Sequence, residues 1–216
     1  MTKRRKWTAI PGLLALAAVA VMLSAYSGAS SSQGHGPIQP IAFPHPKHAG
    51  AVADGGLGLN CVYCHYAANK SPDPGMPAVG TCIGCHAVVP GSTPQGKAEI
   101  AKLVAFSTKN RPIPWVRIHK VPEYVHFPHV RHVNAGVTCQ TCHGQVQKMD
   151  RVYQYSSLNM GWCVQCHVNG YDPQEGLKAA GYAPLTSAPG TTSANTTPTP
   201  AAQKKKARYD CANCHY

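Results

Sequence analysis

Apolar residues gather in one long run near the start of the chain. Residues 7–26 contain no charged side chain, begin with Trp7 and end with Tyr26. About 20 apolar residues in a helix span the roughly 30 Å hydrocarbon core of a bilayer, and aromatic residues favour its two interfaces. The pattern therefore predicts an N-terminal transmembrane helix over 7–26, after a basic cytoplasmic tail at 1–6.

A cleaved signal peptide is the alternative interpretation of this run. Pro11–Ala25 has the length of its apolar region, and Ser27-Gly28-Ala29 supplies the small residues of a cleavage site. We favour a retained anchor because the uncharged run is long enough to span. In both cases the cluster Lys3–Lys6 stays cytoplasmic, and the chain after residue 30 is translocated.

Beyond residue 30, periodic patterns are few. Ile100, Leu103 and Val104 follow helical spacing and predict a helix over 98–107. Residues 111–115 hold two prolines and are expected to form an extended strand or loop. The chain has 20 glycines and 19 prolines but only three Phe and three Trp. It therefore has few large side chains with which to offset chain entropy, and long regular elements are not expected.

A single motif, Cys-x-x-Cys-His, occurs five times and uses all ten cysteines. On one helical turn, residues three apart lie on the same face, so two thiols can reach the two vinyl groups of one porphyrin. The next residue can then bind the iron from one side, and the motif is the attachment site of a c-type haem. The predicted covalent attachments are Cys61, Cys64, Cys82, Cys85, Cys139, Cys142, Cys163, Cys166, Cys211 and Cys214, and the predicted proximal ligands are His65, His86, His143, His167 and His215.

Zinc sites and disulfides are the competing explanations of this cysteine pattern. One Cys-x-x-Cys could be half of a zinc site or a redox dithiol. Five copies that are all followed by His, with no cysteine left over, favour five covalently bound haem c groups. These large apolar cofactors would form most of the core, so the haem-free chain is expected to be largely unfolded.

A second pattern, Phe-Pro-His-x-x-His, occurs at 43–48 and 127–132, and two haem motifs follow each copy. It predicts duplicated units at 43–86 and 127–167 within a tetrahaem core at 41–182. Two free imidazoles for two irons indicate bis-histidine ligation, and His119 precedes the second unit. The predicted distal ligands are His45, His48, His119, His129 and His132, with the pairing left open.

Other side chains near the motifs receive different roles. His126 is expected to be structural or to contact a propionate, and His35 to be solvated. Met149 or Met160 could replace histidine at one iron and raise its potential, although packing is the usual role of methionine. Met76 is expected to pack.

The formal net charge of +12 does not indicate nucleic acid as a partner. Four positive residues precede the apolar run, four more lie at 204–208, and ten haem propionates would offset much of the rest. Residues 27–40 are expected to be a spacer and 183–206 a flexible linker. The fifth haem is then carried by a tail at 207–216, which must dock on the tetrahaem body or on a partner.

No catalytic constellation is present, so no catalytic residue is assigned. The chain has no nucleophile elbow or phosphate loop and only eight acidic residues. If each iron has two protein ligands, no position is open for a substrate. Electron transfer is then the expected chemistry, tuned by axial ligands, hydrogen bonds and burial.

Three strings give the chain a family resemblance. They are Gln-Pro-Ile-Ala-Phe-x-His-x-x-His-Ala-Gly at 39–50, the segment 115–132 that opens Trp-Val-Arg-Ile-His-Lys, and Leu-x-Met-Gly-Trp-Cys at 158–163. Together they resemble the pentahaem cytochrome c subunit of alternative complex III, over residues 39–167. The expected fold is a multihaem, class III cytochrome-like protein, mostly irregular, with short helices packed around haems and one N-terminal transmembrane helix.

The resemblance implies a subunit of a membrane quinol oxidoreductase. It would take electrons from quinol, beside iron–sulfur and quinol-binding membrane subunits, and pass them to a monohaem cytochrome c, a soluble carrier or an oxidase. It would be a single-pass protein of the cytoplasmic membrane with its haem domain on the periplasmic, extracytoplasmic side. The Thr-, Pro- and Lys-rich stretch 186–206 departs from the family. A stand-alone quinol dehydrogenase and a multihaem reductase with one five-coordinate haem are the alternatives.

The substitution His119→Ala tests the distal assignment that rests on position alone. If His119 binds an iron, its loss leaves that haem five-coordinate, and one low-spin signal should become high-spin in electron paramagnetic resonance. An unchanged spectrum would remove His119 from the set of ligands.

Overall fold

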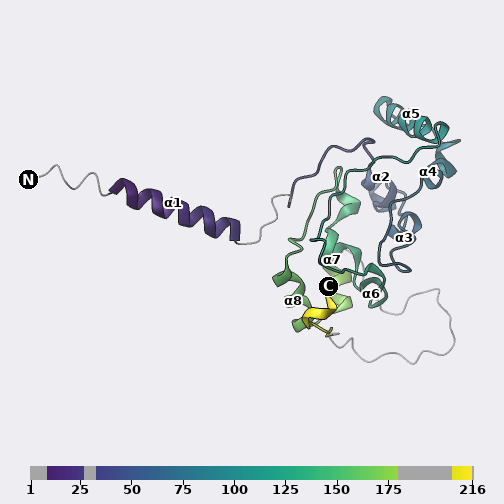
Figure 1. The fold of residues 1–216 in the computed structure, drawn as a ribbon. Coiled ribbons are helices and arrows are strands. Elements are labelled where there is room, and N and C mark those ends of the chain that lie inside the picture. Colours follow the sequence, from purple (N-terminus) through teal and green to yellow (C-terminus); the bar gives the residue numbers. More distant parts are fainter. Residues whose placement is uncertain (1–8, 27–32, 180–205, 216) are drawn as a thin grey trace, which may run out of the picture.

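The computed structural model describes residues 9–26, 33–179 and 206–215 of the chain. Short helices are joined by irregular segments, as the glycine and proline content predicts (Figure 1). The α-helices are α1 Ala9–Tyr26, α2 His45–Ala49, α3 Cys61–Cys64, α4 Val79–His86, α5 Pro94–Thr108, α6 His129–Asn134, α7 Cys139–His143, α8 Met160–Asn169 and α9 Pro173–Ala179. The 3-10 helices are η1 Val52–Asp54, η2 Val146–Lys148 and η3 Cys211–Asn213.

The expected transmembrane helix over 7–26 is a wrong prediction. Helix α1 has 18 residues and includes Pro11 and Gly12 in its first turn. At 1.5 Å per residue it is about 27 Å long, less than a hydrocarbon core of about 30 Å. Over the described residues, no helix has both the length and the apolar content needed to cross a bilayer.

The predicted helix over 98–107 is confirmed as part of α5. It begins earlier, because the Thr93 side chain caps it by accepting a hydrogen bond from the Gly96 amide at 3.0 Å. Leu103 on its inner face packs with Ile41 and Ile113. Partly buried side chains that surround this cluster are Val79, Cys82, Ile83, Phe106 and Trp115. The cluster therefore joins α5 to the start of the first unit and to the helix of the second haem motif.

The polypeptide itself buries little else. Among the described residues, the buried apolar side chains are Ile41, Ala68, Leu103, Ile113 and Met149, and none has less than 2% of its surface exposed. The extended backbone forms only isolated bridges in this part of the chain, Gln33 with Gln154 and Val125 with His215. A fold with so small a core needs further apolar material, and this is consistent with cofactors as its centre.

The two Phe-Pro-His-x-x-His strings adopt the same local structure. In each, the proline precedes a short helix, α2 or α6, and is extended, with φ −86° at Pro44 and −88° at Pro128. Phe43 stacks on His48 and Phe127 stacks on His132, both with ring centres 4.3 Å apart. The repeated sequence thus presents its histidines in the same way twice.

Several segments assigned from sequence lie outside the described residues. These are the basic tail at 1–6, the first part of the spacer at 27–32 and the linker up to residue 205. Of the proposed tail, residues 207–215 are described and lie beside α8 (Figure 1).

The substitution Leu103→Ala should lower the free energy of unfolding by about 2–5 kcal/mol, because it leaves a cavity between Ile41 and Ile113. Val104→Ala on the same helix is the matched control: this side chain is 44% exposed, and its loss should cost less than about 0.5 kcal/mol. Urea unfolding followed by circular dichroism measures both. Equal effects would show that the cluster does not stabilise the fold.

Candidate haem centres

Each Cys-x-x-Cys-His motif begins or contains a helical turn. The motifs lie on α3, α4, α7, α8 and η3, so the two cysteines of each share a face. Asn60 caps α3 by accepting from the Val62 amide at 3.1 Å, and Asn159 caps α8 by accepting from the Trp162 amide at 2.8 Å. These caps satisfy amides that the short helices leave unpaired. In the described part of the chain no two of the ten cysteines are joined in a disulfide.

The thiols of different motifs lie near one another in a definite order. Burial and the nearby Cys64 raise the pKa of Cys82, which connects the second motif to the first. Cys139 donates a hydrogen bond to Cys61 that lowers the pKa of Cys61 to about 6, and this connects the first motif to the third. Burial raises the pKa of Cys142 to about 12, with Cys166 as a further cause, and this connects the third to the fourth.

The fourth motif is connected to the fifth in the same way. Burial raises the pKa of Cys163, and the charge of the nearby Cys214 raises it further. The attachment points therefore follow one another in the order second, first, third, fourth, fifth.

Backbone carbonyls orient three of the proximal histidines. The Nδ1–H group of His65 donates to the Gly75 carbonyl at 3.2 Å, and that of His86 to the Val89 carbonyl at 3.0 Å. The Nδ1–H group of His167 donates to the Arg208 carbonyl at 2.6 Å. A neutral imidazole that donates from Nδ1 keeps a lone pair on Nε2. That atom is then free to bind a metal.

The predicted distal histidines are oriented by the same kind of contact. His48 and His132 donate from Nδ1 to the carbonyl oxygens of Pro44 and Pro128, both at 3.0 Å. His129 donates to the Pro72 carbonyl at 3.1 Å, across the boundary between the two units. Burial is the main cause that lowers the pKa of His129 and of His132, so both stay neutral and able to ligate.

Three pairs of rings have the separation of two ligands on one metal. A metal–nitrogen bond of about 2 Å on each side places two imidazole centres roughly 6 Å apart. The ring centres of His48 and His86 are 6.0 Å apart, and those of His132 and His167 are also 6.0 Å apart. The centres of His129 and His143 are 6.4 Å apart. The second histidine of each string thus faces the second motif of its own unit.

His45 fits a ligand in another respect. Its Nδ1 is buried without a hydrogen-bond partner. Burial, with the nearby His65 and His48, lowers its pKa to about 4. A buried polar atom without a partner costs free energy. Binding a metal would offset part of that cost, and the closeness to His65 makes the first motif the nearest centre.

His119 lies against a proximal histidine. Its Nε2 shares a hydrogen bond with Nδ1 of His143 at 3.2 Å, and the ring centres are 4.3 Å apart. Burial, then the charges of His119, His129 and His65, lower the pKa of His143 to about 3. In this arrangement His119 contacts Nδ1 of His143 and leaves Nε2 as the nitrogen that could bind iron, so the role of His119 as a distal ligand stays a prediction.

The fifth motif lies beside residues 124–126. The ring of Tyr124 is 5.7 Å from that of His215, and Val125 bridges to His215. The amide of His126 donates to the Cys214 carbonyl at 2.8 Å, which gives this exposed residue a backbone role. The exposed His35 hydrogen-bonds through Nδ1 to the Gln33 carbonyl oxygen at 3.1 Å.

The methionines differ in position. Met149 is only 7% exposed and its terminal methyl packs over Gly144, the residue after His143. Met160 begins α8 and is 68% exposed, and Met76 is 59% exposed. Of the two methionines considered as ligands, only Met149 is therefore enclosed near a haem motif.

Sequence patterns did not indicate two features of these centres. The carbonyls of Pro72, Gly75 and Arg208 hold imidazoles, but a backbone acceptor has no side-chain signal. Tyr124 lies beside the fifth motif, and its place in the sequence gave no signal of this contact.

The chain is similar in sequence to a known multihaem protein. No family model matches the chain. Over 152 residues it is 28% identical to the protein described as the menaquinone reductase, multiheme cytochrome c subunit, of Nitratidesulfovibrio vulgaris; the match covers 61% of this chain and 68% of that protein. The chain is similar to a multihaem cytochrome c subunit. This supports a subunit of a quinol oxidoreductase in general and does not single out alternative complex III.

Substituting His48→Ala or His132→Ala should each convert one low-spin haem to high-spin, because each removes one member of a pair with the spacing of axial ligands. Electron paramagnetic resonance of the oxidised protein measures this. His35→Ala is the matched control and should leave every signal unchanged. If either substitution leaves all haems low-spin, the pairing with His86 or His167 is incorrect.

Proposed function

We propose that this chain is a c-type cytochrome with five covalently bound haems that relays electrons as one subunit of a quinol oxidoreductase complex. Haem c supplies one-electron chemistry at its iron. The chain's own residues would attach the group through paired thiols and orient imidazoles through backbone carbonyls.

The observation that carries this proposal is that two pairs of imidazole rings have the separation expected of two ligands on one metal. His48 with His86 and His132 with His167 have equal separations, and each ring is held by a carbonyl on its far nitrogen. A centre closed on both sides has no position for a substrate. It can therefore exchange electrons but not form or break bonds of a bound molecule.

The order of the attachment thiols supports a relay. Thiols of successive motifs lie near one another in the order second, first, third, fourth, fifth. Electrons could therefore enter near α4 and leave near the C-terminal segment, or travel in the reverse direction. Partners would be expected at these two ends.

The partners that fit are those of the menaquinone reductase or alternative complex III kind: iron–sulfur and quinol-binding membrane subunits, and a monohaem cytochrome c, soluble carrier or oxidase as acceptor. Because c-type haems are attached outside the cytoplasmic membrane, we place the haem-bearing chain on its outer side. Attachment to the membrane is assigned to these partners.

A multihaem reductase is the second candidate, and the fifth motif favours it. The ring beside His215 is that of Tyr124, whereas the second and fourth proximal histidines face imidazoles. A weakly ligated fifth iron could bind a small substrate. A high-spin signal and tight cyanide binding that disappear together in Cys211→Ser/Cys214→Ser would support this function.

Quinol should reduce the haems only when the chain is part of its complex. The pockets formed in the described chain by residues 206–210 and by residues 105–111 are open to solvent, and we assign quinol oxidation to another subunit. Haem absorbance after addition of a quinol analogue, with the purified complex and with the isolated chain, measures this. Rapid reduction of the isolated chain would contradict the relay and favour a stand-alone quinol dehydrogenase.

A further inference from the structure

One proximal histidine is held by a distant part of the chain. The carbonyl that accepts from His65 lies ten residues away in sequence, and the one that accepts from His86 lies three away. The acceptor for His167 is the carbonyl of Arg208, 41 residues later, in the segment that leads into the fifth motif. Its distance, 2.6 Å, is also the shortest of the three.

Other contacts fix this segment against the body. The amide of Ala207 donates to the carbonyl of His167 at 3.4 Å. Seven residues further, the Cys214 carbonyl accepts from the amide of His126, and His215 bridges to Val125. The segment is therefore tied to α8 at one end and to residues 125–126 at the other. Figure 1 shows the C-terminal segment beside α8.

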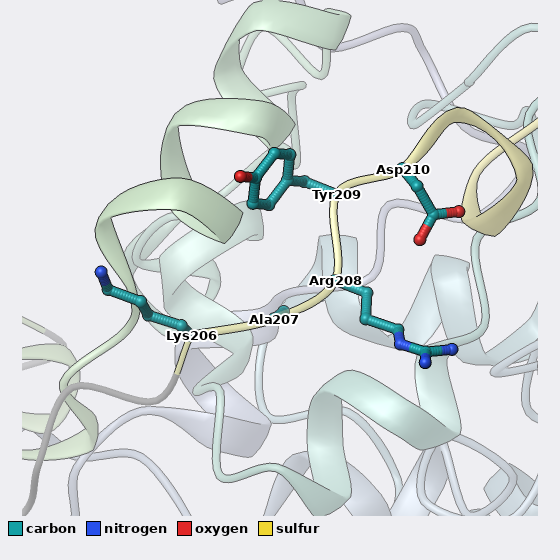
Figure 2. A pocket seen from close by; sticks show the side chains of 5 residues that line it. All are labelled: Lys206, Ala207, Arg208, Tyr209 and Asp210. Atoms are coloured by element: carbon teal, nitrogen blue, oxygen red, sulfur yellow. The ribbon is translucent and has the colours of Figure 1, made fainter.

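The side chains of this segment do not take part in the contact with His167. Figure 2 shows Arg208 and Asp210 directed to one side of the backbone and Lys206 and Tyr209 to the other, around an open pocket. Arg208 is exposed. The contact is therefore made by the peptide group, and its presence depends on where the segment docks rather than on which side chain occupies position 208.

A hydrogen bond from Nδ1–H of an imidazole that binds a metal through Nε2 changes the reduction potential of that metal. Donation from Nδ1–H makes Nε2 a more basic ligand and favours the more highly charged state of the iron. For a haem this lowers the reduction potential. Water would replace the carbonyl if the segment were absent, because the contact lies at the surface, and water is a mobile and less directed acceptor.

We propose that the C-terminal segment 206–215 lowers the reduction potential of the fourth haem through the Arg208 carbonyl, so that docking of the fifth haem and the potential of the fourth are coupled. This rests on the proposed haem attachment. The positioning group is the peptide carbonyl at position 208, which acts through His167, and the Arg208 side chain takes no part. The closeness of Cys214 to Cys163 places the two attachment sites side by side, where such coupling would act on electron transfer between them.

The test compares three variants of the full-length protein by potentiometric titration of haem absorbance. A chain that ends after Lys206 lacks the carbonyl and the fifth haem. Cys211→Ser/Cys214→Ser lacks the fifth haem but keeps the carbonyl. Arg208→Ala keeps both and is the matched control. The fourth haem is identified in each as the signal that becomes high-spin when His132→Ala is added.

The fourth haem should titrate at a higher potential in the truncated chain than in the double-serine variant, and Arg208→Ala should match the unaltered protein. Equal potentials in the truncated and double-serine chains, with the segment docked in the latter, would overturn the proposal. If the segment undocks in the double-serine variant, the reduction potential of the fourth haem should also be higher than in the unaltered protein. A potential equal to that of the unaltered protein would then overturn the proposal.

Hydrogen exchange measures whether the segment is docked in each full-length variant. This measurement does not depend on whether the truncated chain folds with its haems. The His126 amide, which donates to the Cys214 carbonyl, should exchange slowly in the full-length protein. Fast exchange there would mean that the segment is not docked and would refute the proposal. Intact mass separates this failure from the other: a chain with no added tetrapyrroles would refute the proposed function itself.

Discussion

The hydrogen bond from imidazole Nδ1–H to a backbone carbonyl is the interaction on which the centres depend. It recurs at both histidines of the His48–His86 and His132–His167 pairs. Each bond fixes a tautomer and a ring orientation, and it leaves Nε2 as the free nitrogen. Without such restraints, an exposed histidine on a short helix would sample several rotamers, and two rings would not keep a separation of about 6 Å.

These carbonyls come from the irregular chain, which explains why so little regular structure is needed. Proline at 44 and 128 ends the preceding extended segment and leaves its carbonyl pointing at the histidine four residues later. Gly144, with φ 69°, turns the chain sharply after His143, and a Cβ at this position would lie 2.6 Å from the Tyr155 ring. The irregular segments of this chain therefore orient the predicted ligands.

The small apolar core has a corresponding role. The cluster of Ile41, Leu103 and Ile113 lies beside Cys82 of the second motif and not at the centre of the chain. The cluster anchors α5 and the helix that carries the second motif. The other motifs have few buried side chains around them. The stability of the fold is therefore expected to depend on the haem groups that the thiols and imidazoles would bind. Folding and cofactor attachment should accordingly be one process in this protein.

The Cys-x-x-Cys-His spacing was enough to predict the attachment chemistry, because this local motif needs only one helical turn. Spacing within a few residues also predicted the helix at α5 and the repeated Phe-Pro-His-x-x-His strings, and the structure confirms both. The length of α1, in contrast, did not follow from the uncharged run at 7–26. The facing of His48 and His86, the contact of His119 with His143 and the hold of the Arg208 carbonyl on His167 came from the folded chain. These contacts join residues distant in sequence, and the last is made by a peptide group, which is the same in every residue and therefore has no signature in the amino-acid sequence.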